Sequence, residues 1–276
     1  LGLNVWAVRL PSALLGIASI YFVYLFVNKL FPDKKRLGSL AALMLAISPW
    51  HLHFSRGGWE TNTATLFLLV GLYFLGKSLE NNKYFFLTTL TFVASLYAYH
   101  SVRVIIPLLS LAFLIIYFPK IKSIRPILIS AIIGLILLTP LLLQLTSVEG
   151  RSRFSGVSVF ADEGPLWEAL MLRQEHQTVS LPIRLIHSKY ATYSIRFARN
   201  YLSHFSPRFL FINGEEIARS KVPEVGQSLI FLFPFFYIGL FSLIKKKSSS
   251  NLLILSWLLI SPVAAALTFQ SPHALR

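Results

Sequence analysis

The sequence of 276 residues contains no cysteine and few acidic residues. Without cysteine it can form neither a disulfide nor a thiolate metal site, and cysteine usage gives no information on its compartment. Only 13% of the residues are charged, against about 25% in a typical soluble domain. Eleven Asp and Glu against 26 Lys and Arg give a formal net charge of +15. The shortage of charge argues against a water-soluble domain.

Apolar residues dominate instead. They make up 55% of the chain, and the mean hydropathy is +0.63, which excludes a disordered chain. A membrane-crossing helix needs about 20 mostly apolar residues, and the sequence contains eight such runs, at about 12–31, 37–54, 62–78, 84–100, 104–119, 126–146, 227–244 and 251–269. Because a helix satisfies its own backbone hydrogen bonds in lipid, we predict an all-α polytopic integral membrane protein.

The basic residues predict the orientation of these helices. The turns after the first, third, fifth and seventh runs carry twelve Lys and Arg: Lys29, Lys34, Lys35, Arg36, Lys77, Lys83, Lys120, Lys122, Arg125, Lys245, Lys246 and Lys247. The short segments on the other side carry four Arg and no Lys. Cytoplasmic loops are enriched in Lys and Arg, so we expect a protein of the cytoplasmic (inner) membrane. The positive charge then reflects topology and requires no nucleic acid.

This orientation divides the chain into three parts. Residues 1–146 form transmembrane helices one to six, 147–226 form a long extracytoplasmic loop, and 227–276 form two further transmembrane helices. The loop is expected to hold one helix from Pro165 and another from about Ser180–Pro182. Apolar and aromatic residues recur in the second helix every three or four positions, at Ile186, Tyr190, Tyr193, Phe197, Tyr201 and Phe205. This pattern predicts a helix in the membrane interface; the alternative is a helix packed on the protein's own core.

The four arginines of the short outer segments are Arg9, Arg56, Arg103 and Arg276, and all seven His also fall on the outer side. Three of these arginines follow a histidine by three residues, in the pairs His53 and Arg56, His100 and Arg103, and His273 and Arg276. A guanidinium can bind a phosphate through two parallel hydrogen bonds. The set therefore predicts a phosphate or diphosphate site. The alternative is that each arginine reaches lipid headgroups or pairs with a carboxylate.

The stretch SPWHLHFSRGGWET at 48–61 is the densest in polar and aromatic residues. His51 and His53 are two residues apart, so a helix would direct them to different sides and they would not chelate a metal as a pair. Glu60 is the one carboxylate in a short outer segment. It could orient a sugar hydroxyl, join a metal site or pair with Arg56.

Four stretches carry a family resemblance: AVRLPSALLG at 7–16, LAISPWHLHFSRGGWETN at 45–62, YAYHSVRVIIPLL at 97–109 and NYLSHFSPRFLFINGEE at 200–216. Together they resemble bacterial members of the protein O-mannosyltransferase and aminoarabinose transferase superfamily, which are dolichyl-phosphate-mannose-protein mannosyltransferase-like membrane enzymes of the GT-C fold. The resemblance extends over nearly the whole chain. Residues 59–62 depart from it, since relatives often carry another aromatic residue, Asp or Ala there.

The resemblance implies a GT-C-like helical bundle that transfers a sugar, a mannose-like hexose or similar. The donor would be a polyprenyl-phosphate sugar, and the acceptor a protein, lipid or glycan outside the cytoplasm. A carboxylate acts as general base, and a single displacement inverts the anomeric centre. Because the phosphate is the leaving group, the four arginines with His53, His100 and His273 become the implied phosphate-binding residues.

The resemblance places no catalytic base in this chain. In the family the catalytic Asp lies in the first outer loop, so we expect it upstream of residue 1. Glu60 matches a position where relatives carry an acidic residue, and it is a secondary candidate. Some relatives hold a divalent metal near the site, but the sequence assigns no ligands for one. No signal peptide precedes the first run and SPHALR stops directly after the last, so we expect a fragment truncated at both ends.

The alternative function is a transporter or flippase of lipid-linked sugars. Such a protein is expected to show internal repeats, or broken helices with charges inside the membrane. Several runs contain proline, but charges inside them are nearly absent and no repeat is visible. A membrane scaffold without activity would leave the outer Arg and His residues unexplained.

Overall fold

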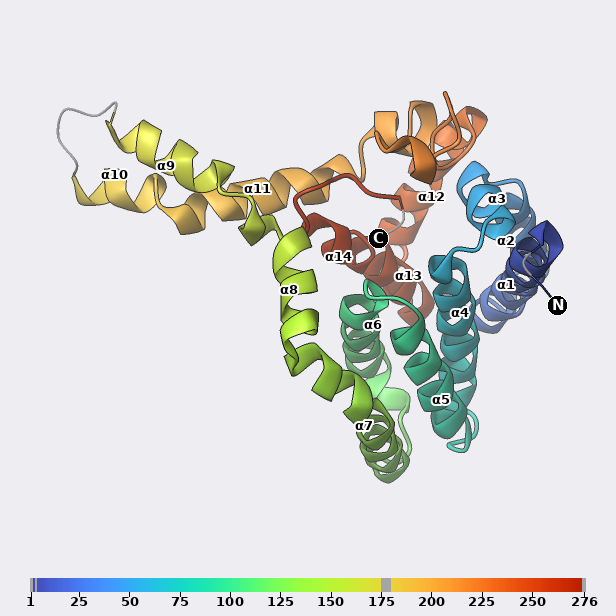
Figure 1. Cartoon of the computed structure of the whole chain (residues 1–276). Helices are drawn as coiled ribbons and strands as arrows, with labels where there is room; N and C mark the ends of the chain where they lie inside the picture. The colour runs from blue at the N-terminus through green and yellow to red at the C-terminus, as the bar shows by residue number, and fades with distance from the viewer. Residues whose placement is uncertain (1, 3, 175–179, 275–276) are drawn as a thin grey trace.

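The computed structural model describes residues 2, 4–174 and 180–274, and these residues fold into helices joined by short loops (Figure 1). Within these residues, the β-structure is limited to one isolated bridge between Ser158 and Thr268. The expected all-α architecture is confirmed.

The main bundle consists of eight helices: α1 (Val5–Leu30), α4 (Glu60–Ser78), α5 (Tyr84–Ala98), α6 (Val102–Tyr117), α7 (Arg125–Thr146), α12 (Phe233–Lys245), α13 (Ser249–Ile260) and α14 (Val263–Ala266). Helix α4 packs against α1 and α5, and α13 packs against α6. The core lies between them and includes Phe26, Leu72, Phe92, Leu109 and Leu253, all buried. A Cβ added to Gly71 of α4 would collide with the Phe92 ring of α5. Small residues of this kind let membrane helices approach closely.

Four described helical stretches are long and apolar enough to cross a membrane: Val5–Leu30, Val102–Lys120, Arg125–Thr146 and Ser249–Ala266. The count rises to five if the bent pair α2 (Leu37–Ala46) and α3 (Pro49–Arg56) forms one span. Tyr84–Ala98 and Ile230–Lys245 are shorter apolar helices. Each of the eight apolar runs therefore coincides with helix, but not every run is a full-length straight span.

The break between α2 and α3 bends this pair by 59°. Pro49 lies in the first turn of α3, where its missing N–H costs no helical hydrogen bond. Ser48 adopts an extended conformation, and its hydroxyl caps α3 by accepting a bond from the His51 N–H. The same hydroxyl donates to the Gln227 carbonyl at 3.0 Å. The bend therefore ties the start of α3 to the segment that follows the long loop.

The long loop forms an arm that projects from the bundle (Figure 1). It contains α8 (Val148–Val157), α9 (Gly164–Gln174), α10 (Leu181–Ile186) and α11 (Lys189–Ser203), with α9 packed against α11. The second expected helix is thus broken in two. Ser188 starts the new helix α11 because its side chain accepts the Ala191 N–H at 3.1 Å.

The aromatic stripe on this second helix lies in two environments. The Tyr193 hydroxyl donates to the Asp162 carbonyl at 3.1 Å, and the Tyr201 hydroxyl donates to the Leu259 carbonyl of α13 at 2.8 Å. These two hydrogen bonds attach this part of the stripe to the arm and to the bundle. Ile186 and Tyr190 are 63% and 72% exposed. For these residues, contact with the membrane interface stays a prediction.

Candidate functional site at the histidine-rich end of the bundle

Helix α1 connects two chemically different ends of the bundle. At one end, the Lys29 ammonium pairs with Glu80, and the Ser250 hydroxyl donates to the Leu30 carbonyl at 2.7 Å. The Lys-rich turns after α1, α4 and α12 therefore meet there. At the other end, the Ser12 hydroxyl donates to the Phe54 carbonyl of α3 at 3.3 Å. The helix from Ser12 to Leu30 rises by roughly 27 Å at 1.5 Å per residue, close to the thickness of a bilayer's hydrocarbon core.

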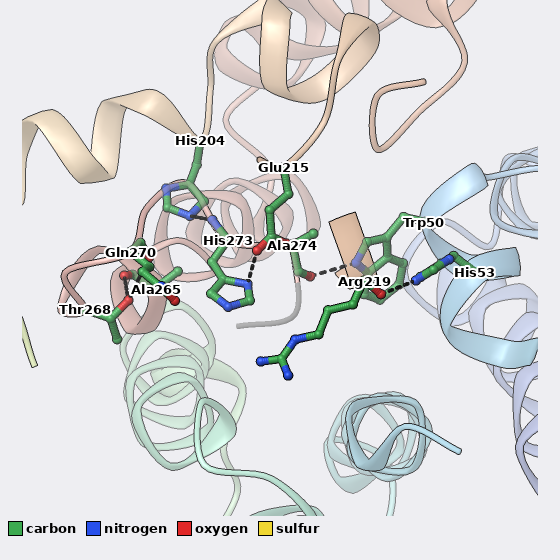
Figure 2. Close-up of polar contacts among 10 residues, drawn as sticks. All are labelled: Trp50, His53, His204, Glu215, Arg219, Ala265, Thr268, Gln270, His273 and Ala274. Atoms are coloured by element: carbon green, nitrogen blue, oxygen red, sulfur yellow. Dashed lines mark hydrogen bonds and ion pairs between the residues drawn. The ribbon is translucent and has the colours of Figure 1, made fainter. Parts of the chain in front are cut away.

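A buried carboxylate organises the second end. Glu215 is 1% exposed, and its Oε1 lies 2.8 Å from Nδ1 of His273, which is 5% exposed. Its Oε2 accepts the backbone N–H of Ala274 at 2.8 Å. A buried carboxylate is costly unless it is paired and hydrogen-bonded. Glu215 meets this condition by holding the segment after α14 against the loop after α11 (Figure 2).

His204 adds a second attachment for the same segment. Its Nδ1–H donates to the Asn200 carbonyl at 2.8 Å, and its Nε2 accepts the backbone N–H of His273 at 3.2 Å. This pattern requires a neutral ring, because a protonated Nε2 could not accept. Burial lowers the pKa of His204 below 6.5, and the nearby His273 acts in the same direction. Hydrogen bonds to the carbonyls of Asn200 and Tyr201, and the charge of Glu215, oppose this shift.

Helix α3 closes the cluster from the other side. The Trp50 indole N–H donates to the Ala274 carbonyl at 2.8 Å, and Nε2–H of His53 donates to the Arg219 carbonyl at 3.0 Å. Trp50 and His53 are three residues apart and so lie on one face of the helix. Figure 2 shows the resulting chain of contacts from His204 through His273 and Ala274 to Trp50. Three segments distant in sequence thus share one polar cluster.

Two of the four arginines singled out in the sequence, Arg9 and Arg56, lie on this end. Arg9 and Arg56 are exposed, and within the described residues neither guanidinium forms an ion pair or a hydrogen bond. Arg56 is one turn after His53 on α3 and therefore shares its face. Arg9 lies near the turn after α3, because a Cβ on Gly58 would sit 3.1 Å from Val8.

The other two arginines of the predicted set are Arg103 and Arg276. Arg103 is half-buried at the start of α6, and its Nε–H donates to the Leu96 carbonyl at 3.2 Å. Arg276 lies outside the described residues. His100 is exposed, as is Glu60, which occupies the first turn of α4. The structure therefore gathers His53, Arg56 and His273 at one end but places Arg103 and His100 on a separate turn.

Two cavities lie away from these arginines. One, of about 520 Å³, borders the turn from Asp33 to Leu40 at the Lys-rich end. The other, of about 610 Å³, lies between the arm and the end of α14, where Phe160, Tyr193 and Leu267 line it. Neither cavity is shared by Arg9, Arg56 and Arg103.

Sequence reasoning missed Glu215, His204, Trp50 and Arg219 as members of the site. Three of them lie in stretches quoted for the family resemblance, 45–62 and 200–216, so the resemblance was the available signal. Arg219 lies just beyond the second stretch. Nothing in the spacing of these residues indicates that they meet.

The described residues assign no ligands to a metal. Across 4–174 and 180–274, no group of three or more His, Asp or Glu side chains converges as metal ligands would. Glu215 and His273 are engaged with each other and with Ala274. We therefore assign no step to a metal.

Comparison with known proteins supports a single family. A family model described as dolichyl-phosphate-mannose-protein mannosyltransferase matches residues 1–143, more than half of the chain. Neither the curated proteins nor the solved structures contained a match to this chain. The matched region contains Arg9, Arg56, Glu60 and Arg103, whereas Glu215 and His273 lie beyond it. Together with its apolar helices, this match makes the chain a multi-pass membrane protein of glycosyltransferase type, and it belongs to the dolichyl-phosphate-mannose-protein mannosyltransferase family.

Proposed function

We propose that the protein transfers a sugar, mannose or a similar hexose, from a polyprenyl-phosphate donor to an acceptor outside the cytoplasm. The acceptor is a protein, a lipid or a glycan. The observation that carries this proposal is the contrast between the ends of α1. One end gathers His, Trp and Arg side chains, and the other gathers the Lys-rich turns.

The proposal explains why the basic residues of the short outer segments are arginines. When the glycosidic bond breaks, negative charge builds up on the phosphate that leaves. Arg9 and Arg56 are exposed and have no intramolecular partner within the described residues, so their N–H donors are free for phosphate oxygens. Arg103 and Arg276 complete the proposed donor-binding set, with His53, His100 and His273 beside them in sequence.

The Glu215 cluster has a positioning role in this proposal. It fixes residues 273 and 274 against α3, so that α3 and the segment after α14 keep one relative geometry. Preorganised donors avoid reorganisation during the reaction. Glu215 is committed to these contacts, which leaves exposed Glu60 as the secondary candidate for activating the acceptor hydroxyl.

The proposal is tested by the substitution Arg56→Lys in the complete protein, assayed with a panel of polyprenyl-phosphate sugars. Lysine keeps the charge but loses the planar fork, so we expect kcat/KM to fall by about tenfold or more. The control is Arg36→Lys, which changes an exposed residue at the Lys-rich end and should leave transfer unchanged. Near-normal transfer by Arg56→Lys would remove Arg56 from the donor site, and no transfer from any donor by the unmodified protein would refute the function.

A further inference from the structure

The loop from Gly214 to Lys221, between α11 and α12, is held by three contacts, two made by Glu215 and one by Arg219. Glu215 binds His273 and Ala274, as described above. Four residues later, the Arg219 carbonyl accepts the His53 N–H at 3.0 Å. Ser220 is 2% exposed. These contacts hold the backbone of the loop in one geometry, which fixes the point from which the Arg219 side chain extends.

At the cluster, this loop carries the side chain of Arg219, which ends in a guanidinium group. Arg219 is exposed, and its nitrogens form no hydrogen bond or ion pair within the described residues. Figure 2 shows the side chain extending away from His53, toward the side of the cluster on which His273 lies. Glu215, the buried carboxylate at this point, is already paired with His273, and within the described residues no carboxylate pairs with Arg219.

A second polar group beside Arg219 also lacks a partner. The Ser220 hydroxyl is buried, and no hydrogen-bond partner for it exists within the described residues. Buried hydroxyl groups are nearly always hydrogen-bonded in folded proteins. Arg219 and Ser220 are adjacent residues whose side-chain donors lack a partner within the described residues, and guanidinium and hydroxyl groups are donors of the kind that bind anions.

We infer that Arg219 binds the phosphate of the polyprenyl-phosphate donor, together with Arg56 one helical turn from His53. This inference rests on the proposed function and adds to it a residue from the loop after α11. The His53 contact links the two arginines, because His53 shares the α3 face with Arg56 and holds the backbone of Arg219. In this inference Arg56 and Arg219 each donate to the phosphodiester of the donor, which carries one negative charge.

The test measures binding rather than turnover, in the complete protein reconstituted in lipid nanodiscs. The probes are a long-chain polyprenyl phosphate and the matching polyprenol, which lacks the phosphate. We expect Arg219→Gln to weaken binding of the polyprenyl phosphate by about tenfold or more, since a charge-assisted hydrogen bond is lost. Binding of the polyprenol should not change. The matched control is Arg208→Gln, an exposed arginine of the same region that does not contact His53.

The outcomes separate this inference from the proposed function. If the unmodified protein binds polyprenyl phosphate no better than polyprenol, the proposed function fails. If it prefers the phosphate and Arg219→Gln keeps that preference, only the role of Arg219 is refuted. Arg219→Lys provides a milder variant, for which an intermediate affinity is expected and an unchanged affinity would count against a bidentate contact.

Discussion

The basic residues at the two ends of the bundle differ in type and in surroundings. At the Lys-rich end, the ammonium groups of Lys34, Lys77, Lys120 and Lys245 lie 5.0–6.0 Å from the centres of aromatic rings. At the histidine-rich end, His204 and His273 are buried and hydrogen-bonded to groups from distant segments. Lysines over aromatic rings are suited to the membrane–water boundary. The lysines of one end thus lie over aromatic rings, whereas the histidines of the other end join distant segments through buried hydrogen bonds.

The largest expected effect concerns which end faces the cytoplasm. Because the chain has no cysteine, single-cysteine variants need no prior removal of thiols. In intact cells, a membrane-impermeant maleimide should label Glu216→Cys, at the histidine-rich end. It should label Lys246→Cys only after permeabilisation, since the Lys-rich turns are expected inside. The reverse pattern would invert the topology and with it the proposed side of the reaction.

The next effect is thermodynamic and concerns Glu215. Glu215→Ala removes the partner of buried His273 and of the Ala274 N–H. We expect the free energy of unfolding to fall by about 3–5 kcal/mol, the usual result of breaking a buried ion pair. An SDS unfolding titration in mixed micelles measures this change.

Glu80 provides the matched control at the other end. Its side chain is 66% exposed where it pairs with Lys29. Glu80→Gln should change the free energy of unfolding by at most about 1 kcal/mol, because exposed ion pairs contribute little. Equal losses for the two substitutions would show that the ends do not differ in the way the structure indicates.

The smallest effect is a pH dependence that arises from His204. Its pKa in the folded protein lies below 6.5, the value for an unperturbed histidine. Below that pH the unfolded chain binds a proton that the folded ring does not, so stability falls as the pH drops, by at most about 1.4 kcal/mol per pH unit. His204→Gln should flatten this dependence. Unfolding titrations at several pH values would reveal it, and parallel curves for the two proteins would contradict the assignment.

Much of the fold follows from the order of residues. Long apolar runs indicate helices because lipid offers no partner to an open backbone, and each of the eight runs coincides with helix. Pro49 and Ser188 show where this reasoning stops. The first lies inside an apolar run and the second inside an apolar stripe, and each begins a new helix through local capping. Hydropathy does not report such breaks.

The site was only partly predictable. His53 and His273 were identified by their spacing to arginines, yet neither histidine owes its contacts to that spacing. His53 binds the Arg219 carbonyl 166 residues away, and the Glu215 carboxylate binds the Ala274 N–H 59 residues away. Glu215 in sequence is one of two adjacent glutamates in a water-facing loop. Its burial depends on a partner that only the folded chain brings to it.

The sequence by itself thus determined that this chain is helical, lies in a membrane and concentrates lysines in the turns after alternate apolar runs, because each property depends on composition within one short segment. The tertiary structure decided which polar groups share a site. Pairing Glu215 with His273 and Trp50 with Ala274 requires α3, the loop after α11 and the segment after α14 to meet. A buried charge is stable only where distant segments supply its partners.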